Sequence, residues 1–191
     1  MVLLALFASG SGSNAEQIAR YFHQRDDVKI ALILSNKADA PVHARAKRLG
    51  IPSVTFSKDA FDKGLEVLDI LRQYQIDFIV LAGFLLKVSQ PLLDAYPRCI
   101  INIHPALLPL YGGKGMYGDR VHRAVVEAGE KESGITIHYV NEHYDEGDII
   151  FQARCELLPG DSPEEVARKV HALEYAHFPE VIDSLVKKLN N

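Results

Sequence analysis

The chain has 191 residues, which is enough for one domain with a sizeable hydrophobic core. Its 21 Lys and Arg residues stand against 25 Asp and Glu residues, and the net charge of −4 argues against a nucleic-acid-binding protein. The two cysteines, Cys99 and Cys155, lie in apolar stretches and are typical of buried thiols in a reducing compartment. We therefore expect folding without disulfides or metals.

The apolar stretch VLLALFA near the N-terminus is too short for a membrane span and has no basic residues ahead of it, as a secretory signal would. It is better explained as a buried first strand. No later segment reaches the length of a membrane helix. We therefore expect a cytoplasmic protein without a membrane partner.

Short runs of Val, Ile and Leu then alternate with segments of helical period, which is typical of βαβ units around a mostly parallel sheet. Strands are predicted near residues 2–8, 28–34, 52–55, 77–81 and 99–104. Helices are predicted near residues 14–24, 40–49, 60–74 and 89–95. In the second helix, Pro41 suits the first turn and Gly50 suits the end.

The pattern changes after Pro109, where four glycines in YGGKGMYG (111–118) predict a loop. A helix near 119–129 follows, with Asp119 as its expected N-cap. GITIHYV and GDIIFQARCEL are then predicted to form an antiparallel strand pair, and DSPEEV, with Asp161 or Ser162 as N-cap, begins a long last helix. The expected fold is an open, mostly parallel, Rossmann-like α/β sheet with helices on both faces.

The first strand ends in the small-residue segment ASGSGSNAEQIA. Between a strand and a helix N-terminus, such residues leave backbone N–H groups free to bind an anion, and Gly12, Ser13 and Asn14 would bring donors to a phosphate. The same segment also fits the dinucleotide pattern GxGxxA. Ser35 and Asn36 stand where an acidic residue for the cofactor's ribose is expected, which disfavours that alternative. A third possibility is a tight turn that binds nothing.

The segment CIINIHPALLP (99–109) places two polar residues, Asn102 and His104, on one face at the carboxyl end of a predicted strand. An amide and an imidazole N–H aimed at one point would stabilise an oxygen that gains negative charge, as in acyl transfer. Alternatively, Asn102 caps a turn and His104 is a core histidine. Asp145 is either a turn residue or a carboxylate that raises the pKa of His104 and helps to move a proton.

Five motifs, in this order, resemble those of the glycinamide ribonucleotide formyltransferases over essentially the whole chain. They are SGSGSN, SNKADA, LAGF, NIHPALLP and the Asp-x-Gly turn at Asp145. The resemblance implies transfer of a formyl group from the co-substrate 10-formyltetrahydrofolate to the amino group of glycinamide ribonucleotide in purine biosynthesis, without a metal. It makes Asn102 and His104 the oxyanion stabilisers and Asp145 the carboxylate that assists proton movement, directly or through a water.

The resemblance also implies where both substrates bind. Gly12, Ser13 and Asn14 would hold the substrate phosphate, and Glu174 would hold its ribose. The pterin of the folate would bind beside LAGFLLKV, largely through backbone groups. The residues expected there are Leu85, Leu86, Lys87 and Val88, while Thr136 and His138 would flank the catalytic site. One domain, 1–191, would then bind phosphate with residues 1–100 and bind folate and carry out catalysis with residues 101–191.

Two stretches depart from the family pattern. The segment at 111–118 is longer and richer in glycine than the connection that follows LLP in typical members. The stretch between the third and fourth strands also differs in length, so no arginine of the family is carried over to Lys58 or Lys63.

Other functions remain as alternatives. A formyltetrahydrofolate hydrolase would share the NIHP strand and the aspartate, but such enzymes carry an extra N-terminal regulatory domain. A formyltransferase acting on methionyl-tRNA would need a basic extra domain. A dehydrogenase-type nucleotide-binding module would need the acidic residue missing after the second strand. The chain is expected to be a monomer or homodimer.

Overall fold

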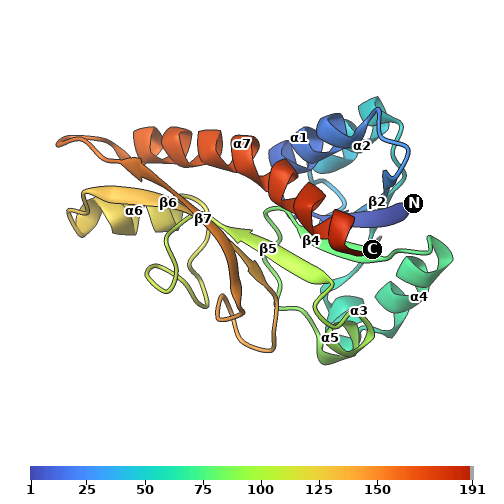
Figure 1. Ribbon diagram of the computed structural model, residues 1–191. Helices are drawn as coiled ribbons and strands as arrows, with labels where there is room; N and C mark the ends of the chain where they lie inside the picture. Colours follow the sequence, from blue (N-terminus) through green and yellow to red (C-terminus); the bar gives the residue numbers. More distant parts are fainter. Residues whose placement is uncertain (190–191) are drawn as a thin grey trace.

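The computed structural model describes residues 1–189, which form one seven-stranded sheet in the order β3-β2-β1-β4-β5-β6-β7 (Figure 1). The first five strands are parallel, and the last two are antiparallel to their neighbours. The strands are β1 (Val2–Phe7), β2 (Val28–Ser35), β3 (Ser53–Thr55), β4 (Phe78–Leu81), β5 (Ile100–His104), β6 (Glu132–Tyr139) and β7 (Ile149–Glu156). The predicted parallel sheet with a C-terminal antiparallel pair is confirmed.

Seven helices connect or follow the strands within the described residues. They are α1 (Ser13–Phe22), α2 (Val42–Leu49), α3 (Lys58–Lys63), α4 (Leu65–Gln73), α5 (Gln90–Ala95), α6 (Asp119–Glu127) and α7 (Pro163–Leu189). The single helix predicted near 60–74 is wrong, because Gly64 adopts a left-handed φ of 78° and divides it into α3 and α4. A glycine takes this conformation without the steric cost that other residues meet.

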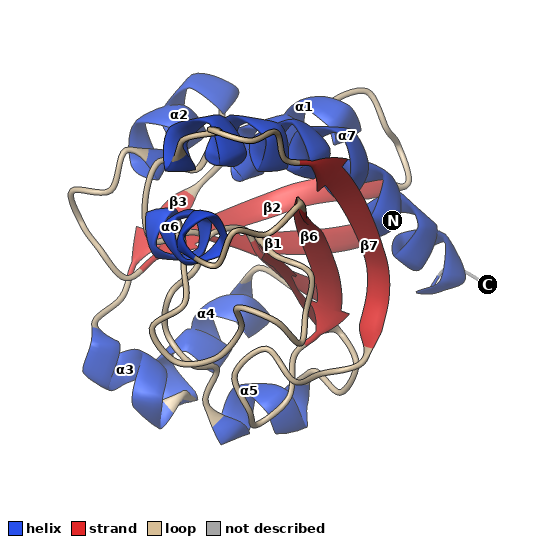
Figure 2. Ribbon diagram, turned by 90° about the vertical axis from the view of Figure 1, so that its left-hand side faces the viewer, coloured by secondary structure: helices blue, strands red, loops and turns tan. Residues whose placement is uncertain are grey.

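The sheet separates two hydrophobic clusters, and Figure 2 shows a layer of helices over each face. Helices α1, α2, α6 and α7 cover one face, while α3, α4 and α5 cover the other. Along β1, Leu4 and Leu6 belong to the first cluster, and Ala5 and Phe7 belong to the second. Successive side chains of a strand point to opposite faces, which explains why this buried strand is apolar at every position.

The helix termini follow the sequence closely, with one exception. Gly50 ends α2 with a φ of 68°, and Ser162 Oγ accepts a hydrogen bond from the Glu165 N–H at the start of α7. Asp119 is not the N-cap of α6, because that position belongs to Gly118 and no side chain caps the helix. Across residues 1–189, no helix combines the length and the apolar composition needed to cross a membrane.

Candidate active site

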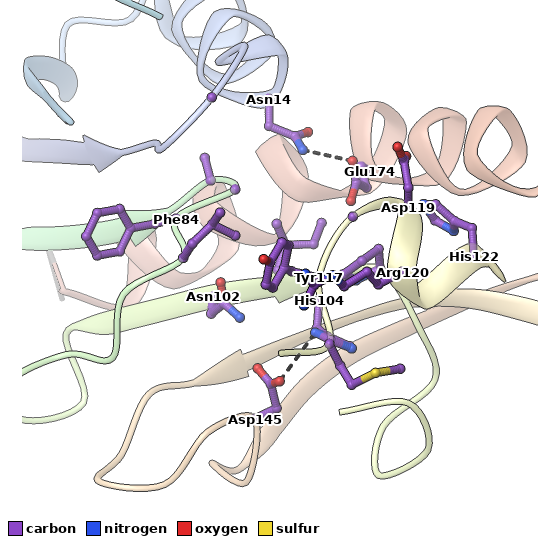
Figure 3. A pocket seen from close by; sticks show the side chains of 18 of the residues that line it. Asn14, Phe84, Asn102, His104, Tyr117, Asp119, Arg120, His122, Asp145 and Glu174 are labelled. Atoms are coloured by element: carbon purple, nitrogen blue, oxygen red, sulfur yellow. Dashed lines mark hydrogen bonds and ion pairs between the residues drawn. The ribbon is translucent and has the colours of Figure 1, made fainter. Parts of the chain in front are cut away.

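A cavity of about 470 Å³ opens beyond the carboxyl ends of β1, β4 and β5 (Figure 3). Four segments line it, namely residues 10–14, 82–85, 102–105 and 113–120, together with His122, Tyr144, Asp145, His171 and Glu174. This is the edge where ligands collect in open parallel sheets. The cavity has two polar regions. The α1 end is formed by residues 12–14 with His122, His171 and Glu174, and the β5 end is formed by Asn102, His104 and Asp145.

Gly12 shapes the α1 end. It is the N-cap residue of α1 with a φ of 71°, and no side chain caps the helix. A Cβ at this position would overlap Val42 Cγ2 and lie 3.1 Å from Val42 Cα, so only glycine lets α2 approach so closely. Arg45 Nε donates to the Ser11 carbonyl 2.7 Å away and holds the loop from the α2 side. The uncapped N–H groups of α1 are well suited to bind an anion.

Asn14 and Glu174 join α1 to α7 inside the cavity. Asn14 Nδ2 donates to Glu174 Oε2 over 2.8 Å (Figure 3). His171 Nδ1 lies 2.9 Å from the same oxygen. Glu174 is buried, with an exposed fraction of 4%. The hydrogen bond to this carboxylate raises the pKa of His171, although burial of the ring opposes the shift. These two contacts hold a buried carboxylate at the position where the family resemblance implies a ribose-binding residue.

At the β5 end, Asn102 and His104 share the face of the sheet opposite Ile101 and Ile103, which lie in the α1-side core. Asn102 Nδ2 lies 3.1 Å from His138 Nε2, and His138 Nδ1 lies 2.8 Å from the Tyr139 carbonyl oxygen. Because a carbonyl only accepts, the proton of a neutral His138 is on Nδ1, and Nε2 accepts from the amide. The second N–H of the Asn102 amide remains for a ligand.

His104 is buried, and its ring orientation is set by Tyr111. His104 Nε2 donates to the Tyr111 carbonyl 2.7 Å away, while Nδ1 lies 3.5 Å from Asp145 Oδ2 (Figure 3). Burial lowers the pKa of His104, and this effect outweighs the opposing influence of Asp145 and the carbonyl. Asp145 does raise the pKa of His104, in the direction expected from the sequence, but burial lowers it by more. Its neutral ring has no proton on Nδ1.

Asp145 is at once a turn residue and a member of the site. It has a left-handed φ of 58°, and its Oδ2 accepts the Gly113 N–H over 2.9 Å. Burial raises the pKa of Asp145, but the His138 and His104 rings and the Gly113 N–H together hold it below its ordinary value. The carboxylate is therefore ionised at neutral pH, and its Oδ2 lies 3.5 Å from His104 Nδ1.

The predicted folate-binding residues line a smaller pocket beside the main cavity. Its volume is about 60 Å³, and it shares Asn102 and Asp145 with the β5 end. Leu85, Leu86, Lys87 and Val88 all belong to its lining. Phe84 anchors this segment, because its ring packs edge-on against Phe7 with a centroid distance of 5.4 Å. The two pockets therefore meet at the side chains that were predicted to be catalytic.

Thr136 lies beside His104 in the sheet, but its side chain supports the backbone and not the cavity wall. Its hydroxyl donates to the Ala106 carbonyl over 2.7 Å and accepts the Leu108 N–H over 2.9 Å, and the residue does not line either pocket. It holds the turn that follows β5. Both residues of the predicted flanking pair adjoin the site on β6: Thr136 is the strand partner of His104, and His138 is the strand partner of Asn102 and also contacts its side chain.

Sequence reasoning missed several residues that line or support the cavity. His171 could have been found, because it precedes Glu174 by one helical turn and the two side chains share a helix face. Tyr111 and Gly113 act through their backbone groups, which carry no residue-specific signal. His122 is also missed, although it lines the cavity with an exposed fraction of 1%.

Comparison with known proteins gives consistent matches. The profile of the formyl transferase family matches residues 3–182. Phosphoribosylglycinamide formyltransferase of Bacillus subtilis is 38% identical and aligns over 100% of this chain and 97% of its own length. The chloroplastic enzymes of Arabidopsis thaliana and Vigna unguiculata are 41% and 40% identical over 97% of this chain, which spans 65% and 61% of their lengths.

Solved structures agree with these matches. The phosphoribosylglycinamide formyltransferase of Streptococcus pneumoniae superposes with a TM-score of 0.86 at 35% identity, covering 97% of this chain and 99% of that one. The glycinamide ribonucleotide transformylase 1 of Symbiobacterium toebii gives a TM-score of 0.89 at 33% identity, covering 98% and 89%.

Proposed function

The chain belongs to the formyl transferase family, and on this premise we propose that it transfers the formyl group of 10-formyltetrahydrofolate to the amino group of glycinamide ribonucleotide, a step of purine biosynthesis. The observation that carries the proposal is the meeting of Asn102, His104 and Asp145 at one end of a cavity whose other end is the uncapped N-terminus of α1. A phosphorylated amine fits that distribution of groups. All of residues 1–191 would serve as one domain.

The two substrates would enter from opposite sides of Asn102. The phosphate of the ribonucleotide binds the N–H groups at Gly12, Ser13 and Asn14, and its ribose lies against Glu174. The folate binds in the pocket beside Leu85–Val88, so that its formyl group reaches Asn102 and Asp145. The amine and the formyl carbon then meet at the β5 end.

In the first step, the lone pair of the substrate amine forms a bond to the formyl carbon, and an electron pair of the carbonyl moves to its oxygen. The free N–H of the Asn102 amide donates to the oxyanion, since His138 holds the other one. A preorganised donor of this kind is typically worth about 3 kcal/mol in the transition state.

The second step moves a proton. The former amine nitrogen carries a positive charge after attack, and it loses a proton to the pair formed by His104 Nδ1 and Asp145 Oδ2. The protonated Nδ1 can then donate to the oxyanion, because Nε2 stays bonded to Tyr111. Collapse of the intermediate breaks the bond from the formyl carbon to the folate nitrogen, which takes up the proton and leaves as tetrahydrofolate.

An assay of the purified protein tests this function. Tetrahydrofolate release is followed from 10-formyltetrahydrofolate with and without glycinamide ribonucleotide, and the formylated ribonucleotide is measured by mass spectrometry. We expect turnover only when both substrates are present. Equal release without the ribonucleotide would instead identify a hydrolase, and no release would contradict both functions.

Assembly and location stay as predictions. We infer a monomer or homodimer in the cytoplasm, with no nucleic-acid partner, from the acidic net charge of −4 and the small-molecule cavity. Light scattering of the purified protein measures the oligomeric state.

A further inference from the structure

One buried imidazole of the cavity is not used by the proposed mechanism. His122 lies in the second turn of α6 with an exposed fraction of 1%, and it lines the cavity at the α1 end. Its Nδ1 has no hydrogen-bond partner among residues 1–189. A buried ring nitrogen without a partner costs stability, and nearly all such groups in folded proteins are paired with protein, water or ligand.

Packing alone does not account for this histidine. Its neighbours on the buried face of α6 are Val121 and Val125, which fill the core as apolar residues. A leucine at position 122 would cover the same region without leaving a polar atom unpaired. The ring also meets His171 edge-on, with a centroid distance of 6.2 Å and an interplanar angle of 75°, so His122 adjoins the His171–Glu174 pair.

Glu174 has a carboxylate oxygen that is free to accept a hydrogen bond from the same ligand as His122. Among the described residues, the hydrogen bonds from Asn14 and His171 both end on Oε2, which leaves Oε1 to accept from a ligand. In Figure 3, Glu174 lies between Asn14 and His122 along the wall of the cavity. A free carboxylate oxygen beside an unpaired imidazole can bind two neighbouring hydroxyl groups, because a hydroxyl both donates and accepts.

The surrounding charge selects a neutral ligand group. The carboxylates of Glu174 and Asp119 line the part of the cavity beside His122, so a phosphate is better placed at the N–H groups of residues 12–14 than next to this ring. Burial lowers the pKa of His122, and the neighbouring His171 lowers it further, so the ring is neutral and adds no positive charge. A hydroxyl-rich group without charge fits better than an anion.

We propose that His122 is a substrate-contacting specificity residue, whose ring hydrogen-bonds one of the two vicinal ribose hydroxyls while Glu174 Oε1 accepts from the other. This inference rests on the proposed function, since it concerns the same ribonucleotide. It adds a second recognition group for the sugar and predicts that the enzyme discriminates against deoxyribose analogues of its substrate.

The test combines two variants with three substrates. His122→Leu removes the ring nitrogens, and His122→Asn keeps a polar group near the position of Nδ1. The substrates are glycinamide ribonucleotide and its 2′-deoxy and 3′-deoxy analogues. For the ribonucleotide, His122→Leu should raise KM about threefold to tenfold with little change in kcat, which is the usual effect of losing one neutral hydrogen bond. His122→Asn should recover part of the affinity.

The two deoxy analogues distinguish a direct contact between His122 and a ribose hydroxyl from a purely structural role of His122. For the analogue that lacks the hydroxyl bound by His122, wild type and His122→Leu should have equal KM values, whereas the other analogue should keep the full difference. A penalty of the same size for all three substrates would mean a purely structural role and would overturn the inference. His177→Leu, a matched change on α7 outside the cavity lining, should leave all three KM values unchanged.

The same experiment distinguishes this inference from the proposed function. If wild type turns over the ribonucleotide and neither His122 variant changes KM, the inference alone is wrong. If wild type gives no turnover with any of the three substrates, the proposed function is wrong and the inference is wrong with it. Both variants are checked for folding by circular dichroism before the assay.

Discussion

The two ends of the cavity are built in different ways. At the α1 end, consecutive backbone N–H groups follow from one local segment, and a single long-range bond from Asn14 fixes Glu174. At the β5 end, the polar side chains contact groups from other loops and strands, and two of these groups belong to Tyr111 and Asp145, which have left-handed φ values of 56° and 58°. Residues other than glycine rarely adopt this conformation, and it persists only where surrounding contacts hold it.

This difference suggests separate roles under the proposed function, with substrate binding at the α1 end and chemistry at the β5 end. Under the proposed function, the α1 end would bind the substrate equally before and during reaction, which should set KM. The donors and the proton acceptor of the β5 end would act where charge develops, which should set kcat. Substitutions can break or sharpen this division.

Asp145→Asn should have the largest effect. The amide cannot take a proton from the attacking amine through His104, so we expect kcat to fall by roughly a thousandfold, with KM changed only a few-fold. Steady-state kinetics measure both constants. Glu142→Gln, an exposed change in the same loop, is the control. Unimpaired kcat in Asp145→Asn would reduce Asp145 to a turn residue.

Gly12→Ala should have the second-largest effect, and it should act on KM and not on kcat. The new Cβ meets Val42 in a backbone conformation that alanine disfavours, so the loop must shift and the phosphate site with it. We expect KM for the ribonucleotide to rise about tenfold or more and the protein to lose about 1–3 kcal/mol of stability. Thermal unfolding and kinetics measure these effects.

Gly10→Ala is the matched control for that change, because a Cβ at Gly10 has no atom within 4 Å. The control should keep the melting temperature of wild type. If both variants unfold at the same temperature, the close approach of α2 does not constrain the loop.

Tyr111→Phe should have a smaller effect, directed at the β5 end. The Tyr111 hydroxyl donates to Glu130 Oε1 over 2.7 Å and ties down the residue whose carbonyl orients His104. Loss of this bond costs about 1–3 kcal/mol of stability, and we expect kcat to fall a few-fold because the ring of His104 is less well held.

Glu130→Gln weakens the same bond from the other side and should give a similar change. In the double variant the two effects should not add, since both act on one interaction. Full additivity in kinetics would show that Tyr111 does not act through Glu130.

The smallest expected effect concerns the pH dependence of stability. Burial lowers the pKa of His104 and of His122 in the folded protein. As the pH falls, these two side chains therefore take up protons in the unfolded chain while they are still neutral in the folded protein. The free energy of unfolding should therefore decrease as the pH falls from 7 to 5. Urea unfolding of His122→Leu should show a shallower decrease. A steeper decrease would contradict this assignment.

Much of the α1 end could be predicted from the sequence. Gly12, Ser13 and Asn14 lie at a strand-to-helix turn, where small residues favour anion binding over the two alternatives of a dinucleotide site and a turn that binds nothing. Asn102 and His104 could be paired as well, because a strand repeats every two residues. Their partners could not be predicted, since the orientation of His104 depends on a carbonyl of a glycine-rich loop and that of Asn102 on His138 of the next strand.

The sequence by itself determined the alternation of strands and helices, the direction of the parallel strands and the identity of the polar residues at their ends. These properties depend on local periodicity and on the fixed handedness of βαβ units. Only the tertiary structure decided that Asp145 meets His104. The antiparallel strand β6 ends beside Ile101 of β5, and the loop before β7 then folds back so that Asp145 Oδ2 lies 3.5 Å from His104 Nδ1. It also decided the protonation of His104, since burial outweighs the nearby carboxylate and no residue pattern measures that balance.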